Sequence, residues 1–455
     1  MDTRFLIGSS LLFVAAAANA AEDGDGRPNV VVIYTDDMGI GDLSVYNNGW
    51  VETTNIDRLA SQGIRLCSYY SAAPVSSPSR AAWMTGLFPL ETGINTYLHT
   101  REANRLHEQR DFLPAEYMTI ADVFKKSGYR TGHFGKWHLG GGRDVNNAPG
   151  IKEYGFDEYL STYESPDAAP ELTATNWIWS PQDEIKRWNR TGYFGEKAIE
   201  FMKADRTRPF YVNLWPDDMY TPWIPDVDAF ENKLGWQSEE YFRRVLEDYD
   251  RQIGRFLERL EAEGLMENTI IIFTSDNGPF PDFERKRTTG YRGVKDCLHE
   301  GGIRMPFIVR WDGVIAPGGV DSTSVVCAVD MIPTLAAMAG IALPEDLHVS
   351  GEDMSMALLG TPVERKGDLM WEYGRKEAFV RLGTPDNWSP HLCIRRGPWK
   401  LLMNGDGSSV ELYNILEDPF ETTDISSEKK MLVRRLSHKL IAWWKNRPII
   451  NNSSN

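Results

Sequence analysis

Short apolar runs rich in β-branched residues recur along the chain, and they constrain its fold more than any other feature. The first, residues 29–35 (NVVVIYT), lacks polar alternation, which is typical of a strand buried on both faces of a parallel sheet. Similar runs lie at residues 129–135, 208–215, 269–274 and 305–310, and amphipathic segments at 113–128 and 238–264 predict helices. This alternation predicts an α/β fold with a mostly parallel central sheet and helices on both faces.

The last part of the chain follows a different pattern. Short strands separated by turns are predicted at residues 369–373, 392–395, 399–403 and 410–413, followed by a helix at 429–444. We therefore expect a small C-terminal antiparallel sheet with one covering helix.

The N-terminus has the pattern of an export signal. Arg4 precedes an apolar run at residues 5–18, and residues 18–20 (ANA) fit a small-residue cleavage site. The run is too short for a membrane anchor, and no other segment predicts a membrane span. The alternative is a buried N-terminal helix. We expect a signal peptide at 1–20, a catalytic domain at 21–360, a C-terminal subdomain at 361–455, and a periplasmic or secreted location.

Charge and cysteine content exclude some functions. The chain has 49 basic and 65 acidic residues and a formal net charge of -16, which argues against a nucleic-acid partner. An anionic substrate would therefore need a local basic pocket or a bound cation. An exported protein can form disulfides, but the cysteines are few and widely spaced, so we expect isolated buried thiols at Cys67, Cys297, Cys327 and Cys393.

Two of the apolar runs end in oxygen-donor side chains. Asp36 and Asp37 follow the first run, and Asp276 and Asn277 follow the fourth. Ligands of open α/β sheets bind beyond the carboxyl ends of strands, and adjacent carboxylates repel unless a cation lies between them. A donor set of oxygens alone favours calcium or magnesium over zinc. The alternative is that these residues only start turns and cap helices.

Residues 76–86 (SSPSRAAWMTG) predict an anion site at the start of a helix. Pro78 suits a first helical turn, which places Ser76 at the N-terminus, where backbone N–H groups and the helix dipole favour an anion. Arg80, one turn later, can direct its guanidinium to the same place.

This segment resembles the signature of the formylglycine-dependent sulfatase family, in the alkaline phosphatase-like superfamily. The signature is Cys or Ser, any residue, Pro, Ser, Arg, four residues and then Thr-Gly; the chain matches its serine type throughout. Three further segments resemble family motifs: residues 135–140 (GKWHLG), Lys295 with residues 300–306 (EGGIRMP), and residues 411–414 (ELYN) with Asp418, Pro419 and Glu421.

The resemblance implies a role for each matching residue. One calcium ion would be bound by Asp36, Asp37, Asp276, Asn277 and the modified Ser76. The nucleophile would be surrounded by Arg80, Lys136 and His138, with Lys295 on the sulfate. Residue 76 would be oxidised to formylglycine, whose hydrate attacks sulfur, so a serine-type sulfatase-maturating enzyme is an implied partner. The implied substrate is a sulfated carbohydrate.

One position departs from the family pattern. Tyr220 stands where the family usually has a His that contacts the sulfate ester and helps to protonate the leaving group, and an unperturbed phenol is a poor acid near neutrality. Lys295 alone, or His299, could assist instead, or the chain could be a weak or inactive relative. We also expect His99, Arg101 and His391 to lie in sugar-binding loops.

Two alternative functions follow from these features. A phosphatase or phosphodiesterase of the same superfamily would use unmodified Ser76 with two zinc ions, but those relatives have a His where this chain has Asn277. A catalytically weak or inactive glycan-binding relative is the second alternative, and Tyr220 is the feature that favours it.

Overall fold

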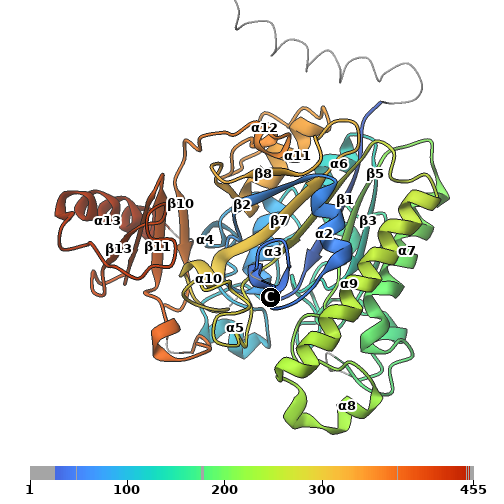
Figure 1. Ribbon diagram of the computed structural model, residues 1–455, viewed down its shortest axis with the longest axis horizontal. Helices are drawn as coiled ribbons and strands as arrows, with labels where there is room; N and C mark the ends of the chain where they lie inside the picture. Colours follow the sequence, from blue (N-terminus) through green and yellow to red (C-terminus); the bar gives the residue numbers. More distant parts are fainter. Residues whose placement is uncertain are drawn as a thin grey trace, which may run out of the picture.

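The computed structural model describes residues 26–47, 49–175, 179–376, 378–446, 448 and 450. The predicted signal peptide lies outside these residues. The expected α/β fold is confirmed: a mostly parallel central sheet lies between two layers of helices, and a small antiparallel sheet follows near the C-terminus (Figure 1).

The central sheet has nine strands in the described chain, in the order β4-β3-β5-β1-β6-β7-β2-β8, and β9 also pairs with β2. Among the strand pairs of this sheet, only those of β7 with β6 and β2 are antiparallel. The strands are β1 (Asn29–Thr35), β2 (Ile64–Tyr70), β3 (Arg130–Gly135), β4 (Glu158–Ser161), β5 (Phe210–Trp215), β6 (Thr269–Ser275), β7 (Arg304–Arg310), β8 (Gly319–Asp321) and β9 (Val326–Cys327).

β1 shows why a continuous apolar run forms a central strand. Val30 and Val32 pack into the core on one face of the sheet, Val31 and Ile33 pack into the core on the other, and none is exposed. The first core also contains residues of α3 (Ser76–Thr85), α6 (Ile120–Lys126) and α11 (Met331–Met338), and the second contains residues of α2 (Thr54–Ser61), α7 (Arg190–Ala204) and α9 (Glu239–Ala262).

Shorter helices connect these layers. They are α4 (Pro89–Thr92), α5 (Arg101–Leu106), α8 (Val227–Glu231), α10 (Glu300–Ile303) and α12 (Ser355–Leu358), with 3₁₀ turns at Ile40–Asp42, Ile151–Tyr154, Pro170–Leu172, Arg187–Asn189, Lys233–Gly235, Ala328–Asp330 and Pro385–Asn387. In the part of the chain that the structure describes, no helix is both long enough and apolar enough to cross a membrane.

The helix expected at residues 113–128 is shorter than predicted. α6 begins at Ile120 because Thr119 caps it: the Thr119 hydroxyl accepts from the Asp122 N–H, and the Asp122 carboxylate accepts from the Thr119 N–H. The preceding residues are held elsewhere, since the Leu113 N–H donates to the Leu139 carbonyl at 2.9 Å. The helix expected at 238–264 is confirmed as α9.

β2 is not among the strands expected from apolar runs. Its sequence, IRLCSYY, places the half-buried Arg65 and Cys67 between buried residues, so a continuous apolar signal is missing. Antiparallel pairing with β7, in which Leu66 lies opposite Phe307, fixes it in the sheet. This strand therefore depends on contacts that are distant in sequence.

The C-terminal sheet follows the expected pattern. Its order is β10-β11-β12-β13, all pairs are antiparallel, and Leu436 and Leu440 of the last helix pack against it. The elements are β10 (Leu369–Glu372), β11 (Leu392–Arg396), β12 (Trp399–Met403), β13 (Glu411–Asn414) and α13 (Lys430–Lys445), at the left of Figure 1. The domain boundary expected at residue 360 stays a prediction.

The cysteines are unpaired thiols. Cys297, Cys327 and Cys393 are buried and Cys67 is half-buried. Burial raises the pKa of Cys297 to about 11 and that of Cys327 to about 12, so both stay protonated near neutral pH.

Candidate active site

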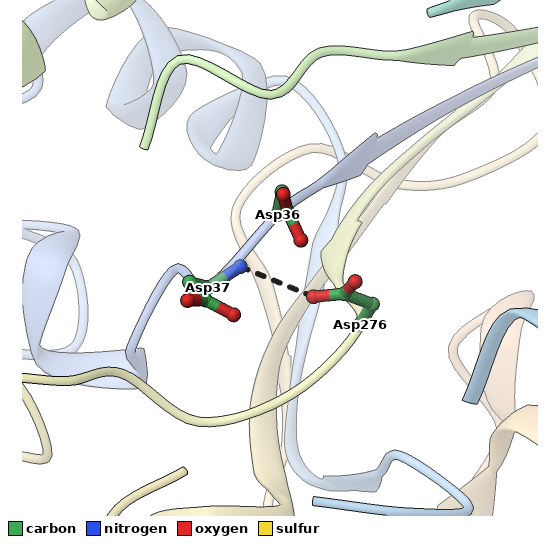
Figure 2. A group of neighbouring side chains, drawn as sticks. All are labelled: Asp36, Asp37 and Asp276. Carbon is green, nitrogen blue, oxygen red and sulfur yellow. Dashed lines mark hydrogen bonds between the residues drawn. The ribbon is translucent and has the colours of Figure 1, made fainter. Parts of the chain in front are cut away.

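The acidic clusters meet because β1 and β6 are parallel neighbours. Thr35 and Ser275, the last residues of the two strands, lie opposite each other in the register. Asp36 and Asp37 therefore leave the sheet beside Asp276 (Figure 2). Single ligand atoms of these three buried carboxylates lie within 4.8 Å of one another.

The donor set around these carboxylates fits a hard cation. The Asp37 N–H donates to Asp276 Oδ1 at 3.1 Å, and Asn277 Nδ2 donates to Asp37 Oδ1 at 2.7 Å, which fixes their positions. Burial raises the pKa of Asp276 to about 7, Arg80 opposes this shift, and the charges of Asp36 and Asp37 add to it. Crowded buried carboxylates with only oxygen donors are suited to calcium or magnesium.

Ser76 is the first residue of α3, as its sequence context predicts. Val75 is the extended N-cap, and Pro78 lies in the first turn. Ser76 is buried, and its hydroxyl lies 2.9 Å from Asp36 Oδ1 and 3.3 Å from Asn277 Oδ1, where either oxygen can accept its proton. The residue predicted to be the nucleophile thus directs its oxygen into the acidic cluster.

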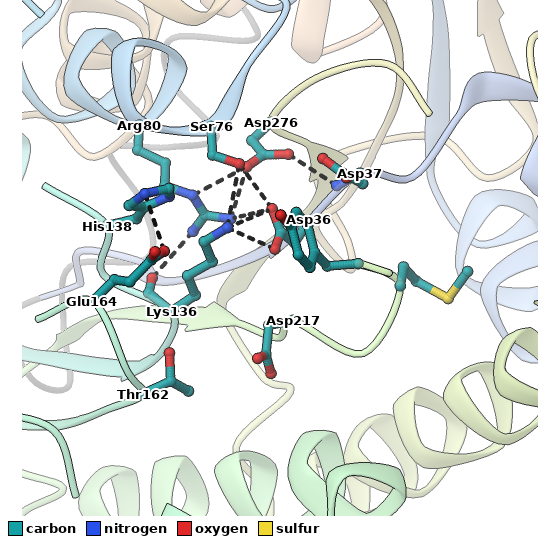
Figure 3. A network of polar contacts seen from close by, with 12 residues as sticks. Asp36, Asp37, Ser76, Arg80, Lys136, His138, Thr162, Glu164, Asp217 and Asp276 are labelled. Atoms are coloured by element: carbon teal, nitrogen blue, oxygen red, sulfur yellow. Dashed lines mark hydrogen bonds and ion pairs between the residues drawn. The ribbon is translucent and has the colours of Figure 1, made fainter. Parts of the chain in front are cut away.

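Three buried cations face the three carboxylates, and Figure 3 shows two of them, Arg80 and Lys136. Arg80 donates to Asp276 Oδ2 through Nε at 3.1 Å and through a terminal nitrogen at 2.8 Å. Lys136 Nζ lies 2.8 Å from Asp36 Oδ2 and 3.4 Å from the Ser76 hydroxyl. Lys295 Nζ, outside the labelled set of Figure 3, donates to Asp37 at 2.7 and 2.8 Å.

These ion pairs keep Asp36 and Lys295 charged. Burial alone would raise the pKa of Asp36, but Lys136, Arg80 and Lys295 outweigh burial and hold it below its ordinary value. Burial lowers the pKa of Lys295, but Asp37 and other negative groups raise it by more than burial lowers it. The net shift of the pKa is therefore upward. The three cations balance the three carboxylates, so a bound metal ion would have to supply the excess positive charge that holds an anion in a protein of net charge -16.

Lys136 is positioned by the end of β3. Gly135 has φ +127°, and an added Cβ would lie 2.0 Å from the Trp215 carbonyl oxygen of β5, so only glycine fits. The Lys136 N–H donates to that carbonyl at 2.8 Å. This close approach of two strands places the Lys136 side chain at the cluster.

The hydrogen bonds of His138 indicate its tautomer. Nε2 lies 3.2 Å from the Leu98 carbonyl oxygen and 3.1 Å from Glu164 Oε2, and both oxygens can accept its proton. Nδ1 is buried without a hydrogen-bond partner among the described residues. Burial lowers the pKa of His138 to about 4, with Glu164 opposing the shift. His138 is therefore neutral, with its lone pair on Nδ1.

Tyr220 lies between two of the cations. Its ring centroid is 4.8 Å from Lys136 Nζ and 4.5 Å from Lys295 Nζ. Lys295 lowers the pKa of Tyr220, but burial and the negative charges of Asp37 and Glu164 raise it, and the net shift is upward. A pocket beside this ring is lined by Asp36, Lys136, Thr162, Tyr163, Glu164, Asp217 and Tyr220.

The predicted sugar-binding residues lie in different places. His99 is partly buried; burial and Arg143 lower its pKa, Glu164 opposes this shift, and His99 is not among the residues that line the pocket. Arg101 instead holds its own loop, donating to Asp111 Oδ2 at 3.0 Å and to Asn147.

The other two histidines that we predicted to be near the substrate, His299 and His391, are in the C-terminal half of the chain. His391 Nε2 lies 3.1 Å from an Arg381 nitrogen, at the start of β11. The expectation that His299 replaces the missing acid is not supported: it is fully buried, and its Nδ1 lies 3.2 Å from Glu421 Oε1, in a different ionic cluster.

Several polar residues of the site carry no sequence signal. Glu164 contacts His138, and Asp217 lines the pocket while accepting from Arg190 at 2.9 Å (Figure 3). Asp296 directly follows Lys295, and its Oδ1 lies 2.7 Å from the Tyr373 hydroxyl of the C-terminal part. Glu164 and Asp217 stand outside the recognised motifs, and tertiary packing brings all three into place.

Two family models match this chain. The model described as Sulfatase matches residues 28–341, and the model described as N-sulphoglucosamine sulphohydrolase, C-terminal, matches residues 293–446. The N-acetylgalactosamine-6-O-sulfatase of Bacteroides thetaiotaomicron is 28% identical, with 91% of this chain and 92% of that protein covered. The N-acetylgalactosamine-6-sulfatase of Canis lupus familiaris is 30% identical, with 77% of this chain and 69% of that protein covered. Arylsulfatase A of Homo sapiens is 29% identical, with 88% of this chain and 79% of that protein covered.

Solved structures agree with this family match. A Bacteroides thetaiotaomicron structure described with the metabolism of multiple glycosaminoglycans has a TM-score of 0.72 at 25% identity, covering 92% of this chain and 100% of that one. A complex of Ps i-CgsB with k-i-k-neocarrahexaose has a TM-score of 0.71 at 25% identity, covering 93% and 94%.

Proposed function

The chain belongs to the sulfatase family, and from this premise we propose that it hydrolyses the sulfate ester of a sulfated sugar through a formylglycine made from Ser76. The observation that carries the proposal is the position of Ser76: its oxygen lies at the N-terminus of α3, 2.9 Å from Asp36 and 3.4 Å from Lys136 Nζ. Two relatives are named N-acetylgalactosamine-6-O-sulfatase and N-acetylgalactosamine-6-sulfatase, and these names support a sugar substrate.

The chemistry explains why serine itself is insufficient. A serine hydroxyl is a weak nucleophile and would end as a stable sulfate ester. The hydrate of an aldehyde has two hydroxyls on one carbon. One oxygen attacks sulfur, forming a new S–O bond while the bond from sulfur to the sugar oxygen breaks. The second hydroxyl then loses its proton, its electron pair forms the C=O bond, and the C–O bond to sulfate breaks.

The buried cations and His138 have separate roles in these steps. Arg80, Lys136 and Lys295 neutralise the sulfate oxygens as charge shifts in the transition state. His138 Nδ1, neutral and unpartnered, accepts the proton of the second hydroxyl. Its Nε2–H is held by Leu98 and Glu164, which keeps this tautomer in place.

Asp36, Asp37, Asp276, Asn277 and residue 76 supply the donor set proposed for one calcium ion. When bound, calcium supplies positive charge that makes the hydrate more acidic. The residues already fit this use, because they are buried, provide only oxygen ligands, and include carboxylates held within 4.8 Å.

The proposal also requires a maturating enzyme and a sulfated glycan substrate. A maturating enzyme must oxidise Ser76, with loss of two hydrogens, before the protein is active. The pattern of residues 1–20 supports export to the periplasm or the exterior, where sulfated glycans are available.

A paired-substrate assay tests this function. Protein with a confirmed aldehyde at residue 76 is given 4-nitrophenyl sulfate, 4-nitrophenyl phosphate and a panel of sulfated sugars that includes N-acetylgalactosamine 6-sulfate. We expect sulfate release, little phosphate release, and loss of turnover in Ser76→Ala and on calcium chelation. Phosphate release that is faster than sulfate release would contradict the proposal.

A further inference from the structure

The second step of the proposed reaction places a positive charge on His138. When Nδ1 takes a proton from the hydrate, the neutral ring becomes an imidazolium cation. Burial and the positive charges of Lys136 and Arg80 oppose protonation of this ring. A carboxylate that faces the other ring nitrogen would stabilise the cation for as long as it exists.

Glu164 faces that other ring nitrogen. Its Oε2 lies 3.1 Å from His138 Nε2, and its backbone carbonyl accepts from the His138 N–H at 3.3 Å (Figure 3). Glu164 also lines the pocket to which Asp36 and Lys136 belong. The carboxylate is therefore at the reaction pocket and on the ring nitrogen that does not take the proton.

Arg143 holds the Glu164 carboxylate in place. A terminal nitrogen of Arg143 donates to Glu164 Oε1 at 2.7 Å, which leaves Oε2 for His138. Burial alone would raise the pKa of Glu164, but His138, Lys136 and Arg143 outweigh burial and the net shift is downward. Glu164 is therefore ionised near neutral pH, with each of its two oxygens directed to a separate partner.

The backbone of these three residues is strained. His138, Arg143 and Glu164 have φ values of +55°, +53° and +66°, in the left-handed region that favours glycine. Their loops pack closely, because a Cβ added to Gly141 would lie 2.3 Å from the Pro166 backbone nitrogen. Strain of this kind is concentrated at functional sites. Here it brings an imidazole, a carboxylate and a guanidinium into one chain of contacts.

We propose that Glu164, held by Arg143, is the positioning residue of His138 and stabilises the imidazolium formed in the second step; this assignment rests on the proposed sulfatase activity. The O–H bond of the second hydroxyl breaks and its proton passes to His138 Nδ1. The released electron pair forms the C=O bond, and the C–O bond to sulfate breaks with its pair on the sulfate oxygen. The Nε2–H of His138 stays bonded to Glu164, whose charge offsets that of the ring. The ring then returns the Nδ1 proton to water.

The two steps can be separated with 4-nitrophenyl sulfate, because its nitrophenolate leaves in the first step and Glu164 acts in the second. In aldehyde-bearing Glu164→Gln protein, kcat should fall by roughly 10²-fold and KM should fall with it, so that kcat/KM stays within about threefold of wild type. Rapid mixing should show a burst of about one nitrophenolate per aldehyde, because the sulfated intermediate accumulates.

Glutamine keeps the size of Glu164 but removes its charge. The amide oxygen can accept from Arg143 or from His138 Nε2–H, but the amide NH₂ then meets the other donor. The bond from the His138 N–H to the carbonyl of residue 164 does not depend on this side chain. Arg143→Ala leaves the carboxylate but releases one of its oxygens, so it should show the same kinetic pattern with a smaller loss.

Glu263→Gln is the matched control. Glu263 is also partly buried and paired with two cations, Lys203 at 2.7 Å and Arg259 at 3.3 Å, but it does not line the pocket. Its kcat and KM should equal those of the wild type, with no burst. A burst in this variant as well would mean that the kinetic pattern is not specific to Glu164, and would overturn the assignment.

The outcomes separate this assignment from the function on which it rests. Equal losses of kcat and kcat/KM without a burst, or an unchanged kcat, in Glu164→Gln overturn the role of Glu164 alone. A wild-type protein that cleaves no sulfate ester overturns the proposed function and this assignment with it. If Glu164→Gln does not fold, Arg143→Ala decides: a burst with a lowered KM supports the assignment, and any other result overturns it.

Discussion

At the scale of single residues, the site combines groups that hold charge with groups that move protons. Arg80, Lys136 and Lys295 remain cations because each is paired with a buried carboxylate. His138 is shifted toward its neutral form, mainly by burial. A neutral His138 suits the role of a base near neutral pH.

Tyr220 should act through its ring. Because the ring lies between the ammonium groups of Lys136 and Lys295, Tyr220→Ala should lower kcat/KM by about fivefold, from the loss of cation–π contacts worth ~1 kcal/mol. Tyr220→Phe should lose less, because its ring remains, and Tyr220→His should not raise activity above wild type, since the two neighbouring ammonium groups disfavour a protonated imidazole. A gain in Tyr220→His, measured with a sulfated sugar, would show that the missing histidine limits the reaction.

The acid limb of the pH profile should report His138. The base is active when neutral, and its pKa of about 4 lies below the ordinary value of 6.5. Activity on 4-nitrophenyl sulfate should therefore stay constant as the pH falls through 6.5 and should decline only near pH 4. A kcat profile with its midpoint near 6.5 would mean that His138 is not the base.

At the scale of elements, the ends of parallel strands gather the site. The acidic pairs after β1 and β6 could be predicted because each follows an apolar run, and Lys136 could be predicted because residues 135–140 resemble a family motif. The start of α3 at Ser76 could be predicted from Pro78. Glu164, Asp217 and the contact of Asp296 with Tyr373 could not, because they depend on contacts between residues that are far apart in the sequence. β2 could not be predicted either, because its antiparallel partner β7 is more than two hundred residues away in the sequence.

Gly135 should be essential to the β3–β5 contact. In Gly135→Ala, the new Cβ would lie 2.0 Å from the Trp215 carbonyl oxygen, so the strand end and Lys136 must shift. We expect kcat to fall by at least about tenfold, because misplacing a catalytic group by about 1 Å costs up to 10²-fold. Gly313→Ala is the control: φ is also positive, at +77°, but no atom lies within 4 Å, so only stability should fall, by about 1 kcal/mol. Equal kcat values for the two variants would refute this prediction.

At the scale of the whole molecule, a buried ionic cluster joins the catalytic part to the C-terminal sheet. Lys400 of β12 lies 2.9 Å from Glu300 of α10 and 2.9 Å from Glu421, and all three side chains are fully buried. His299 belongs to this cluster through Glu421. The two parts are therefore linked by charges that cannot be hydrated.

Removing Lys400 should loosen this link. Lys400→Met leaves Glu300 and Glu421 without their shared cation, and breaking a buried pair typically costs about 3–5 kcal/mol. Urea denaturation should show a loss of that size. Arg58→Ala, which removes an ion pair that is about half exposed, should cost less than about 1 kcal/mol. Similar losses in both variants would mean that the buried cluster adds no special stability.

The central claim is that residue 76 works as formylglycine. The most direct measurement is mass spectrometry of the tryptic peptide of residues 66–80, from protein purified from its natural host and shown to release sulfate. The account predicts a peptide lighter than the encoded one by two hydrogens, or heavier than that form by one water, and reactive toward hydrazides. An unmodified serine in fully active protein would contradict it.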